Sequence, residues 1–297
     1  MTSNISRRNV FRGAGVAVFG AAVAGLATGC SSVAVGGPAS GTAANLLETA
    51  KSQGFLRVGI ANEPPYTQVS ADGKVTGCEP DVLRAVCQRL GIGDVQGIVT
   101  PYESMIPGLN ANRWDVIAAG LFMKQSRCSQ VRYSEPVIVS TESFATPKGN
   151  PKGITSVAGI LADKSLRIAV LPGGFEEGVL KAANVPASQQ VKVNDGRSGL
   201  EALKANRADA FMLPTLSLKA LAKDDPSFDI TAPVKDAPRT GSGAAFRQAD
   251  ASFHEAYNKE LTAFKKTPEF AGILTKWGFD PSVVEGVTAQ ELCQTAG

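Results

Sequence analysis

Apolar positions along this chain follow two periods in turn. Short continuous apolar runs are typical of buried strands, and apolar residues three or four positions apart are typical of helices. In the first half the pattern predicts helices at 46–54, 79–90 and 104–110 and strands at 55–60, 95–99 and 114–120. Gly54 and Gly91 end two of these helices, as glycine C-caps do.

The alternation begins again after a break at residues 149–153. The second half predicts a helix ending at Ala183, further helices at 198–204, 251–265 and 268–277, and strands at 166–170, 191–193, 209–213 and 244–247. Alternating strands and helices favour mostly parallel sheets with helices on both faces. We therefore predict an α/β fold of two lobes, with a ligand in the cleft between them, outside the carboxyl ends of the strands.

The N-terminal segment has the features of an export signal. An arginine pair at 7–8 precedes an apolar run at 13–26, which ends shortly before Cys30. The run is about 14 residues long, shorter than the roughly 20 that span a bilayer as a helix. We expect a twin-arginine lipoprotein signal over 1–29 and lipidation of Cys30. Residues 30–45 are small and polar, as in a flexible tether, so we expect an extracytoplasmic protein, anchored to the cell membrane by lipid or periplasmic.

Composition excludes several classes of function. The formal net charge of +3 includes the three arginines of the signal, so the body is close to neutral and nucleic acid is not an expected partner. His254 is the only histidine, which excludes Ser-His-Asp, Cys-His and multi-histidine metal sites. We therefore expect no metal, no cofactor and no catalytic residue.

Four cysteines remain besides Cys30, namely Cys78, Cys87, Cys128 and Cys293, and they allow three pairings in a compartment that permits disulfides. Cys78 and Cys87 lie just before and within one short predicted helix, where a bridge is geometrically awkward. Cys128 and Cys293 could close a long loop. No C-x-x-C occurs, so nothing supports a thioredoxin-like role.

Several motifs then stand in order along the body. They are VGIANEPPY at 58–66, GCEPDVL at 77–83, IPGLNANRWDVIAAG at 106–120, Ser126-Arg127, YSEPV at 133–137, GLEALKANRADA at 199–210 and GAAFR at 243–247. With these motifs, residues 54–280 resemble the extracellular solute-binding proteins of family 3, the receptors of polar amino-acid ABC importers.

The resemblance implies two lobes joined by two crossing strands, near 142–146 and 241–246. Lobe 1 would then be discontinuous, formed by residues 46–145 and 241–297, with lobe 2 over 146–240.

Arg127 matches the arginine that binds the ligand carboxylate in that family. The chemistry agrees, because a planar guanidinium donates two parallel charge-assisted hydrogen bonds to a carboxylate.

Two positions depart from the amino-acid receptors. We include Gly120 in the site. The amino-acid receptors have a Ser or Thr two residues after this glycine, whereas this chain has Phe122. They also place an aspartate for the α-ammonium shortly after the strand at 209–213, where this chain has Pro214 and Thr215. Ordinary amino acids are therefore less favoured as ligands.

Aromatic residues and one acid replace those groups: Glu63, Tyr66, Tyr102 and Phe122. Aromatic faces attract a delocalised cation, each by about 0.5–2 kcal/mol. Together with Arg127, the set resembles the ectoine- and hydroxyectoine-binding branch of the family. That resemblance implies a glutamate against the amidinium, an aromatic box around it and the arginine on the carboxylate. The segments at 127–128 and 291–293 also look like that branch.

Lobe 2 is expected to supply the opposite wall. Gly173 and Gly174 open a helix, where backbone N–H groups can bind an anionic oxygen. A plain turn with glycines for positive φ explains them equally well. Glu176 and Glu177 are first-turn acids that favour the helix dipole.

We therefore expect a monomeric, lipid-anchored receptor that closes over a small zwitterionic compatible solute and delivers it to ABC permease subunits. The alternatives are a receptor for a polar amino acid or a betaine-like zwitterion and, less favoured, a periplasmic dehydratase on the same fold.

Overall fold

The computed structural model describes residues 45–295 of the chain. The expected signal over 1–29 and nearly all of the expected tether over 30–45, including Cys30, lie outside these residues. No helix among residues 45–295 has both the length and the apolar content needed to cross a membrane.

The first sheet has the strand order β4-β1-β5-β14-β6. Its strands are β1 (Phe55–Ile60), β4 (Asp94–Val99), β5 (Val116–Ile117), β6 (Val131–Tyr133) and β14 (Ala245–Arg247). The strand β1 runs parallel to β4 and β5, whereas β14 runs antiparallel to β5 and β6. The sheet therefore contains chain from both halves of the sequence.

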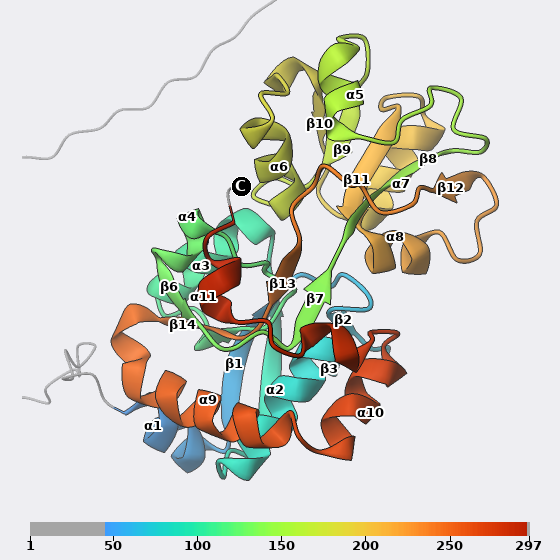
Figure 1. The fold of residues 1–297 in the computed structure, drawn as a ribbon. Coiled ribbons are helices and arrows are strands. Elements are labelled where there is room, and N and C mark those ends of the chain that lie inside the picture. The colour runs from blue at the N-terminus through green and yellow to red at the C-terminus, as the bar shows by residue number, and fades with distance from the viewer. Residues whose placement is uncertain (1–44, 296–297) are drawn as a thin grey trace, which may run out of the picture. The chain divides into compact units, whose positions relative to one another are not determined.

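Helices cover both faces of this sheet, and together they form lobe 1 (Figure 1). The helices are α1 (Leu46–Gln53), α2 (Cys78–Arg89), α3 (Tyr102–Asn110), α9 (Ala251–Phe264) and α10 (Pro268–Lys276). Val116 packs into the cluster that contains α2, α9 and α10, and the next residue, Ile117, packs into the cluster that contains α3. This alternation follows from the period of two along a strand.

The second sheet has the order β10-β9-β11-β8-β12. It contains β8 (Glu142–Pro147), β9 (Ile168–Val170), β10 (Gln190–Lys192), β11 (Ala210–Pro214) and β12 (Phe228–Ile230). Helices α5 (Val157–Ala162) and α6 (Phe175–Ala182) pack on one face, and α7 (Gly196–Lys204) and α8 (Thr215–Leu221) pack on the other, forming lobe 2. The predicted two-lobed α/β fold is confirmed.

Two strands connect the lobes. They are β7 (Ile138–Ser140) and β13 (Thr240–Ser242), an antiparallel pair that places Ser140 opposite Thr240. The crossing expected near 142–146 belongs instead to lobe 2, because β8 pairs with β11 and β12 over these residues. The second crossing, expected near 241–246, begins one residue earlier at Thr240, and residues 245–247 already belong to the lobe 1 sheet.

The remaining elements are short, and the sequence pattern predicted neither them nor β6, β7, β12, α5 and α8. These remaining elements are β2 (Gln68–Val69), β3 (Val75–Thr76), α4 (Gln125–Cys128), α11 (Ala289–Leu292) and the 3₁₀ helices at Ala187–Gln189, Gln248–Asp250 and Pro281–Val284. The predicted strand at 114–120 is reduced to β5, and the chain turns at Gly120 with φ of +66°.

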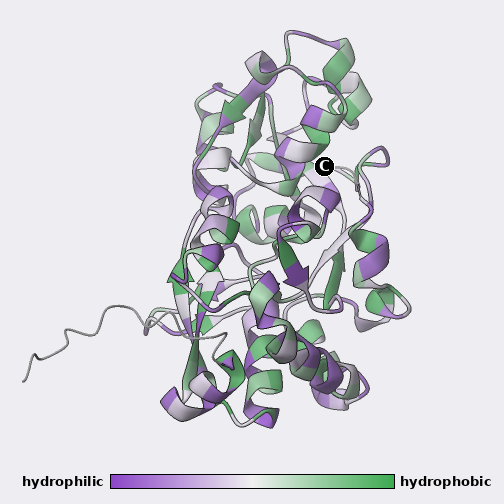
Figure 2. Ribbon diagram, turned by 90° about the vertical axis from the view of Figure 1, so that its left-hand side faces the viewer, coloured by the Kyte–Doolittle hydropathy of each residue, from purple (hydrophilic) through white to green (hydrophobic). Residues whose placement is uncertain are grey.

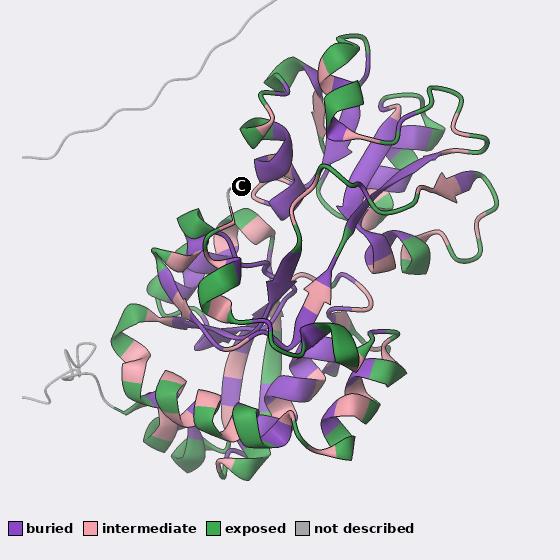
Figure 3. Ribbon diagram, viewed as in Figure 1, coloured by how far each residue is buried: buried purple, intermediate pink, exposed green. Residues whose placement is uncertain are grey.

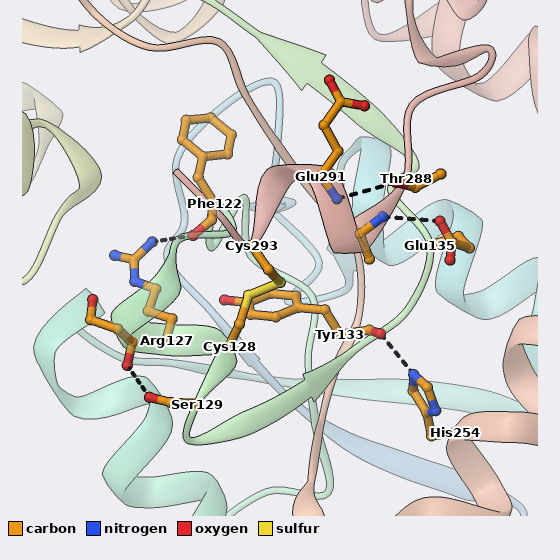
Figure 4. Close-up of a disulfide and its surroundings, with 12 residues drawn as sticks. Phe122, Arg127, Cys128, Ser129, Tyr133, Glu135, His254, Thr288, Glu291 and Cys293 are labelled. Carbon is orange, nitrogen blue, oxygen red and sulfur yellow. Dashed lines mark hydrogen bonds between the residues drawn. A yellow bond between two sulfur atoms is a disulfide. The ribbon is translucent and has the colours of Figure 1, made fainter. Parts of the chain in front are cut away.

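A disulfide joins Cys128, the last residue of α4, to Cys293, just after α11 (Figure 4). It fixes the C-terminal segment to lobe 1, while Cys78 and Cys87 are buried free thiols. Buried residues concentrate in the strands of both lobes (Figure 3), and the outer helices alternate between hydrophilic and hydrophobic residues (Figure 2).

Candidate ligand site

A small cavity of about 10 Å³ lies where loops from the carboxyl ends of strands in both lobes meet. It is lined by Glu63, Tyr102, Gly120, Phe122, Arg127, Phe175, Glu176 and Pro214. A wider cleft of about 830 Å³ shares two of these residues, Glu63 and Tyr102. This place agrees with the rule for ligand sites in open α/β sheets.

Glu63 follows β1 and is buried, with 6% of its surface exposed. Its carboxylate accepts hydrogen bonds from the hydroxyl of Ser217 at 2.5 Å and of Tyr102 at 3.3 Å. Ser217 lies on α8 of lobe 2, so this acid links the two lobes. Burial and the nearby charge of Glu176 raise the pKa of Glu63 to about 7.

Gly120 is required by two constraints. Its φ of +66° is unfavourable for other residues, and a Cβ atom there would lie 3.0 Å from the ring of Tyr66. The Gly120 N–H donates at 2.9 Å to Glu79, whose other oxygen accepts from the hydroxyl of Ser242. Burial raises the pKa of Glu79 to about 7. A buried acid from α2 therefore supports the glycine that forms the cavity floor.

Three aromatic rings continue from lobe 1 into lobe 2. The ring of Phe122 meets those of Tyr66 and Phe175 edge to face, at centroid distances of 5.6 and 5.7 Å. Tyr66 does not line the cavity; its ring packs against Phe279 and its hydroxyl bonds Ser140 on the connecting strand β7. Tyr66 therefore supports Phe122 from behind, and Phe175 closes the cavity from the other lobe.

Arg127 lies on α4 with 5% of its surface exposed. Its Nη1 donates to the carbonyl oxygen of Phe122 at 2.7 Å (Figure 4), and its Nη2 donates to that of Gly173 at 2.6 Å. Gly173 belongs to lobe 2, so the guanidinium is a second polar link between the lobes. Both hydrogen bonds end on neutral carbonyl oxygens. A carboxylate would accept stronger, charge-assisted hydrogen bonds from the same guanidinium.

The conformation of the glycine loop agrees with the second of its two interpretations, a plain turn with a glycine at positive φ. Gly173 N–H donates to the carboxylate of Glu177 at 2.6 Å, and Gly174 N–H donates to Leu171 O at 3.0 Å. Both N–H groups are thus used inside the loop, and neither glycine lines the cavity. Gly173 has φ of +70°, and a Cβ atom there would lie 2.6 Å from backbone atoms of Glu103. This glycine allows close approach of the two lobes.

Lobe 2 does contribute an acid to the cavity. Glu176, which the sequence suggested as a helix-dipole residue, has 3% of its surface exposed and lines the wall beside Pro214. Burial raises its pKa, and its side chain meets that of Glu142, another buried acid, at the start of β8. Pro214 and Thr215 carry no acid for an ammonium group, but Glu176 places a carboxyl group of lobe 2 at the cavity.

The structure thus brings Glu63, Tyr102, Gly120, Phe122 and Arg127 of the predicted site together. Sequence reasoning missed Phe175, Glu176 and Pro214 as lining residues and Ser217 as the partner of Glu63. A signal was present, because these residues lie at or shortly after the carboxyl ends of the strands β9 and β11 of lobe 2, which were the expected place of a ligand.

The chain is similar to known binding proteins over most of its length. Residues 56–280 match the model of the bacterial extracellular solute-binding proteins, family 3. The structure resembles that of EhuB in complex with hydroxyectoine, with a TM-score of 0.82 and 44% identity over 84% of this chain and 98% of EhuB.

Sequence relatives agree with this similarity. The probable amino-acid ABC transporter periplasmic-binding protein y4tE of Sinorhizobium fredii is 31% identical over 83% of this chain and 85% of its own length. The L-cystine-binding protein TcyJ of Escherichia coli is 26% identical over 78% and 85%.

The buried acid below Gly120 generates a prediction about pH. Because the pKa of Glu79 is raised in the folded protein from 4.5 to about 7, the folded state binds more protons than the unfolded state between these values. The contribution of Glu79 to the free energy of unfolding therefore falls as pH rises through this window. Glu79→Gln should reduce the loss of stability between pH 5 and pH 8 by about 2 kcal/mol.

Denaturant unfolding at several pH values measures this effect. The control is Glu285→Gln, which changes an exposed acid and should leave the wild-type pH profile unaltered. An unchanged profile in Glu79→Gln would show that folding does not raise the pKa of Glu79.

Proposed function

The chain belongs to the bacterial extracellular solute-binding proteins, family 3, and from this we propose that it captures ectoine or hydroxyectoine for an ABC importer. Its relatives are transport-binding proteins, and the protein is the solute-binding component of an amino-acid-type ABC transporter. The proposal concerns the identity of the solute and the way it is held.

The composition of the cavity carries the proposal. An arginine, two acids and aromatic rings line one small space, and all are buried or half-buried. Such a set is suited to a compact zwitterion whose cation is delocalised: the guanidinium binds the carboxylate, Glu63 binds the cation, and the faces of Tyr102 and Phe122 surround it. The relation to a protein crystallised with hydroxyectoine supports the same solute class.

Hinge closure is the proposed mechanism. The cavity of about 10 Å³ has space for about one water molecule, so a solute needs the lobes to separate before it enters. The contacts Arg127–Gly173 and Glu63–Ser217 hold the lobes together, and ligand atoms would replace them with stronger charged partners. Contact with both lobes favours the closed form, and β7 and β13 are the connections that bend.

The other parts of the proposal concern the cell. We propose that Cys30 carries the lipid anchor after export by the twin-arginine route, that the protein acts as a monomer with permease subunits as partners, and that it leaves its solute chemically unchanged. We also propose that the second lobe boundary lies at 240/241, and we revise the first, which the sequence predicted at 145/146. In the structure β8 (Glu142–Pro147) is part of the lobe 2 sheet, which favours a first boundary a few residues earlier.

One observation favours a second candidate, a receptor for a polar amino acid. Glu176 supplies a lobe 2 carboxyl group at the cavity, which is what an α-ammonium requires. The aromatic lining and the absence of a hydroxyl at Phe122 favour the delocalised cation over the ammonium.

Calorimetry decides between these ligands. Ectoine or hydroxyectoine should bind, and glutamate, lysine and histidine should not compete at tenfold excess. Mass spectrometry of the recovered ligand should show it unchanged. Tight binding of an α-amino acid with no binding of either ectoine would overturn the proposal and establish the second candidate.

The carboxylate contact gives the next prediction. Arg127→Ala should weaken ectoine binding by at least thirtyfold, since loss of one partner of a buried charge pair costs about 2–5 kcal/mol. Arg127→Lys should restore little, because an ammonium cannot form two parallel bonds. Arg113→Ala, at an exposed arginine of lobe 1, is the control and should bind as the wild type does. Near-normal affinity of Arg127→Ala would remove Arg127 from the site.

The aromatic lining gives a further prediction. Phe122→Leu keeps an apolar side chain but removes the π face. The free energy of ectoine binding should therefore become less favourable by about 0.5–2 kcal/mol. Phe253→Leu, in the core of lobe 1, should lower the free energy of unfolding without changing affinity. Equal affinities of the two variants would mean that Phe122 only packs.

A further inference from the structure

The helix that carries Arg127 is a single turn. It comprises Gln125–Cys128, and the side chain of its N-cap residue, Lys124, makes no capping hydrogen bond. A helix of this length has no stability of its own, because its first turn costs more conformational entropy than its hydrogen bonds return. The geometry of Arg127 therefore depends on the contacts that hold α4 in place.

The C-terminal segment, from α11 onward, holds α4 at both ends. At the start of the helix, the N–H of Gln125 donates to the carbonyl oxygen of Thr295 at 3.0 Å. At its end, Cys128 is bonded to Cys293 (Figure 4). Arg127 lies between these two ties, directly before the disulfide.

The C-terminal segment is itself fixed to the core of lobe 1 and to the connection between the lobes. Leu292 is buried in the same cluster as Leu121 and Met123, the two neighbours of Phe122 in the chain. A Cβ atom on Gly241 of the connecting strand β13 would lie 2.9 Å from the side chain of Leu292. The carbonyl oxygen of Gly241 accepts from the N–H of Met123 at 2.9 Å. One packed unit thus holds the arginine and the Phe122 carbonyl to which it donates.

The disulfide lies at the edge of this unit. Cys128 and Cys293 are half-buried, whereas the free thiols Cys78 and Cys87 are buried. The bond spans 165 positions along the chain, and closure of so long a loop stabilises a fold by restricting the unfolded chain. That effect changes the free energy of unfolding and leaves Kd unaltered. An effect on Kd therefore separates a positioning role from general stabilisation.

We propose that Cys128 and Cys293 are positioning residues, whose disulfide orients Arg127 for the solute. The inference rests on the proposed function, in which Arg127 binds the solute carboxylate, and deepens it. Neither cysteine lines the small cavity, so the bond acts through the arginine. A guanidinium donates two parallel hydrogen bonds to a carboxylate only in a defined orientation. An arginine that is already oriented loses less conformational entropy when the solute binds.

Calorimetry with ectoine tests the proposal. Without the disulfide, α4 keeps only its tie at Gln125, and Kd should rise at least tenfold in the double variant Cys128→Ser/Cys293→Ser. The matched control is Cys87→Ser, which changes a buried free thiol of α2. Its Kd should stay within about twofold of wild type, whatever the change in its free energy of unfolding. A wild-type Kd in the double variant overturns the proposal.

The effect should depend on the presence of Arg127. In an Arg127→Ala background, loss of both cysteines should change Kd by less than about twofold, because the group that the disulfide orients is gone. Titration followed by NMR reaches the weak affinities of this background. An equal loss of affinity in both backgrounds would show that the disulfide acts on the cavity in another way, and the positioning role would be wrong.

A measurement without ligand covers a double variant that fails to fold. Guanidinium protons of Arg127, held by the carbonyl oxygen of Phe122, should give resolved NMR signals in the folded wild-type protein, and their loss in Arg127→Ala identifies them. Dithiothreitol converts the disulfide to two thiols and is itself oxidised to its cyclic disulfide. After this reduction the signals should broaden and Kd should rise at least tenfold. Reduced protein that keeps the signals and the affinity contradicts the proposal.

The outcomes distinguish the inference from the proposed function. If Arg127→Ala loses ectoine but the double cysteine variant binds it as wild type does, the positioning role is wrong and the proposed function stands. If the wild-type protein binds no ectoine, the proposed function itself fails. The guanidinium signals before and after reduction then still show whether the disulfide orients Arg127.

Discussion

Arg127 places a guanidinium group where water hardly reaches. Its environment is arranged to satisfy that group. Two carbonyl oxygens, one from each lobe, accept its hydrogen bonds, and Gly173 allows the loops to come close enough for the second bond. The adjacent Cys128 is bonded to Cys293, so the short helix α4 that carries the arginine is fixed to the C-terminal segment. The cavity is built around this one guanidinium.

Four acids near the cleft are buried, as Arg127 is. Glu63, Glu79, Glu142 and Glu176 are all buried, and burial raises the pKa of each. Glu79 is supported by a backbone N–H and a hydroxyl, as a structural acid requires. Glu63 and Glu176 line the cavity instead, where a charged partner can be exchanged for another. Position relative to the cavity, rather than residue type, thus separates acids that hold the fold from acids suited to a ligand.

The sequence predicted the parts of this structure that depend on local pattern. The bounds of β1 were predicted correctly. Its six residues form a mostly apolar run that stands between a C-cap glycine and a proline pair. Arg127 and Glu63 were found because they stand in motifs. Tyr66 was placed in the site with Tyr102 and Phe122, but its ring direction depends on Phe279, more than 200 residues away along the chain. Glu176 likewise interacts with Glu142, 34 residues away along the chain, which no local pattern indicates.

The strand order of lobe 1 has a consequence for biosynthesis. Strand β14, from residues 245–247, lies between β5 and β6, so the first sheet is incomplete until the chain beyond lobe 2 has emerged from the ribosome. All five strands of the second sheet lie within residues 142–230, so that sheet is available earlier as a complete unit. Domains of a nascent chain generally fold as they become complete. The lobe that begins first in the sequence is therefore the one that finishes last, and it is also the lobe that carries Arg127.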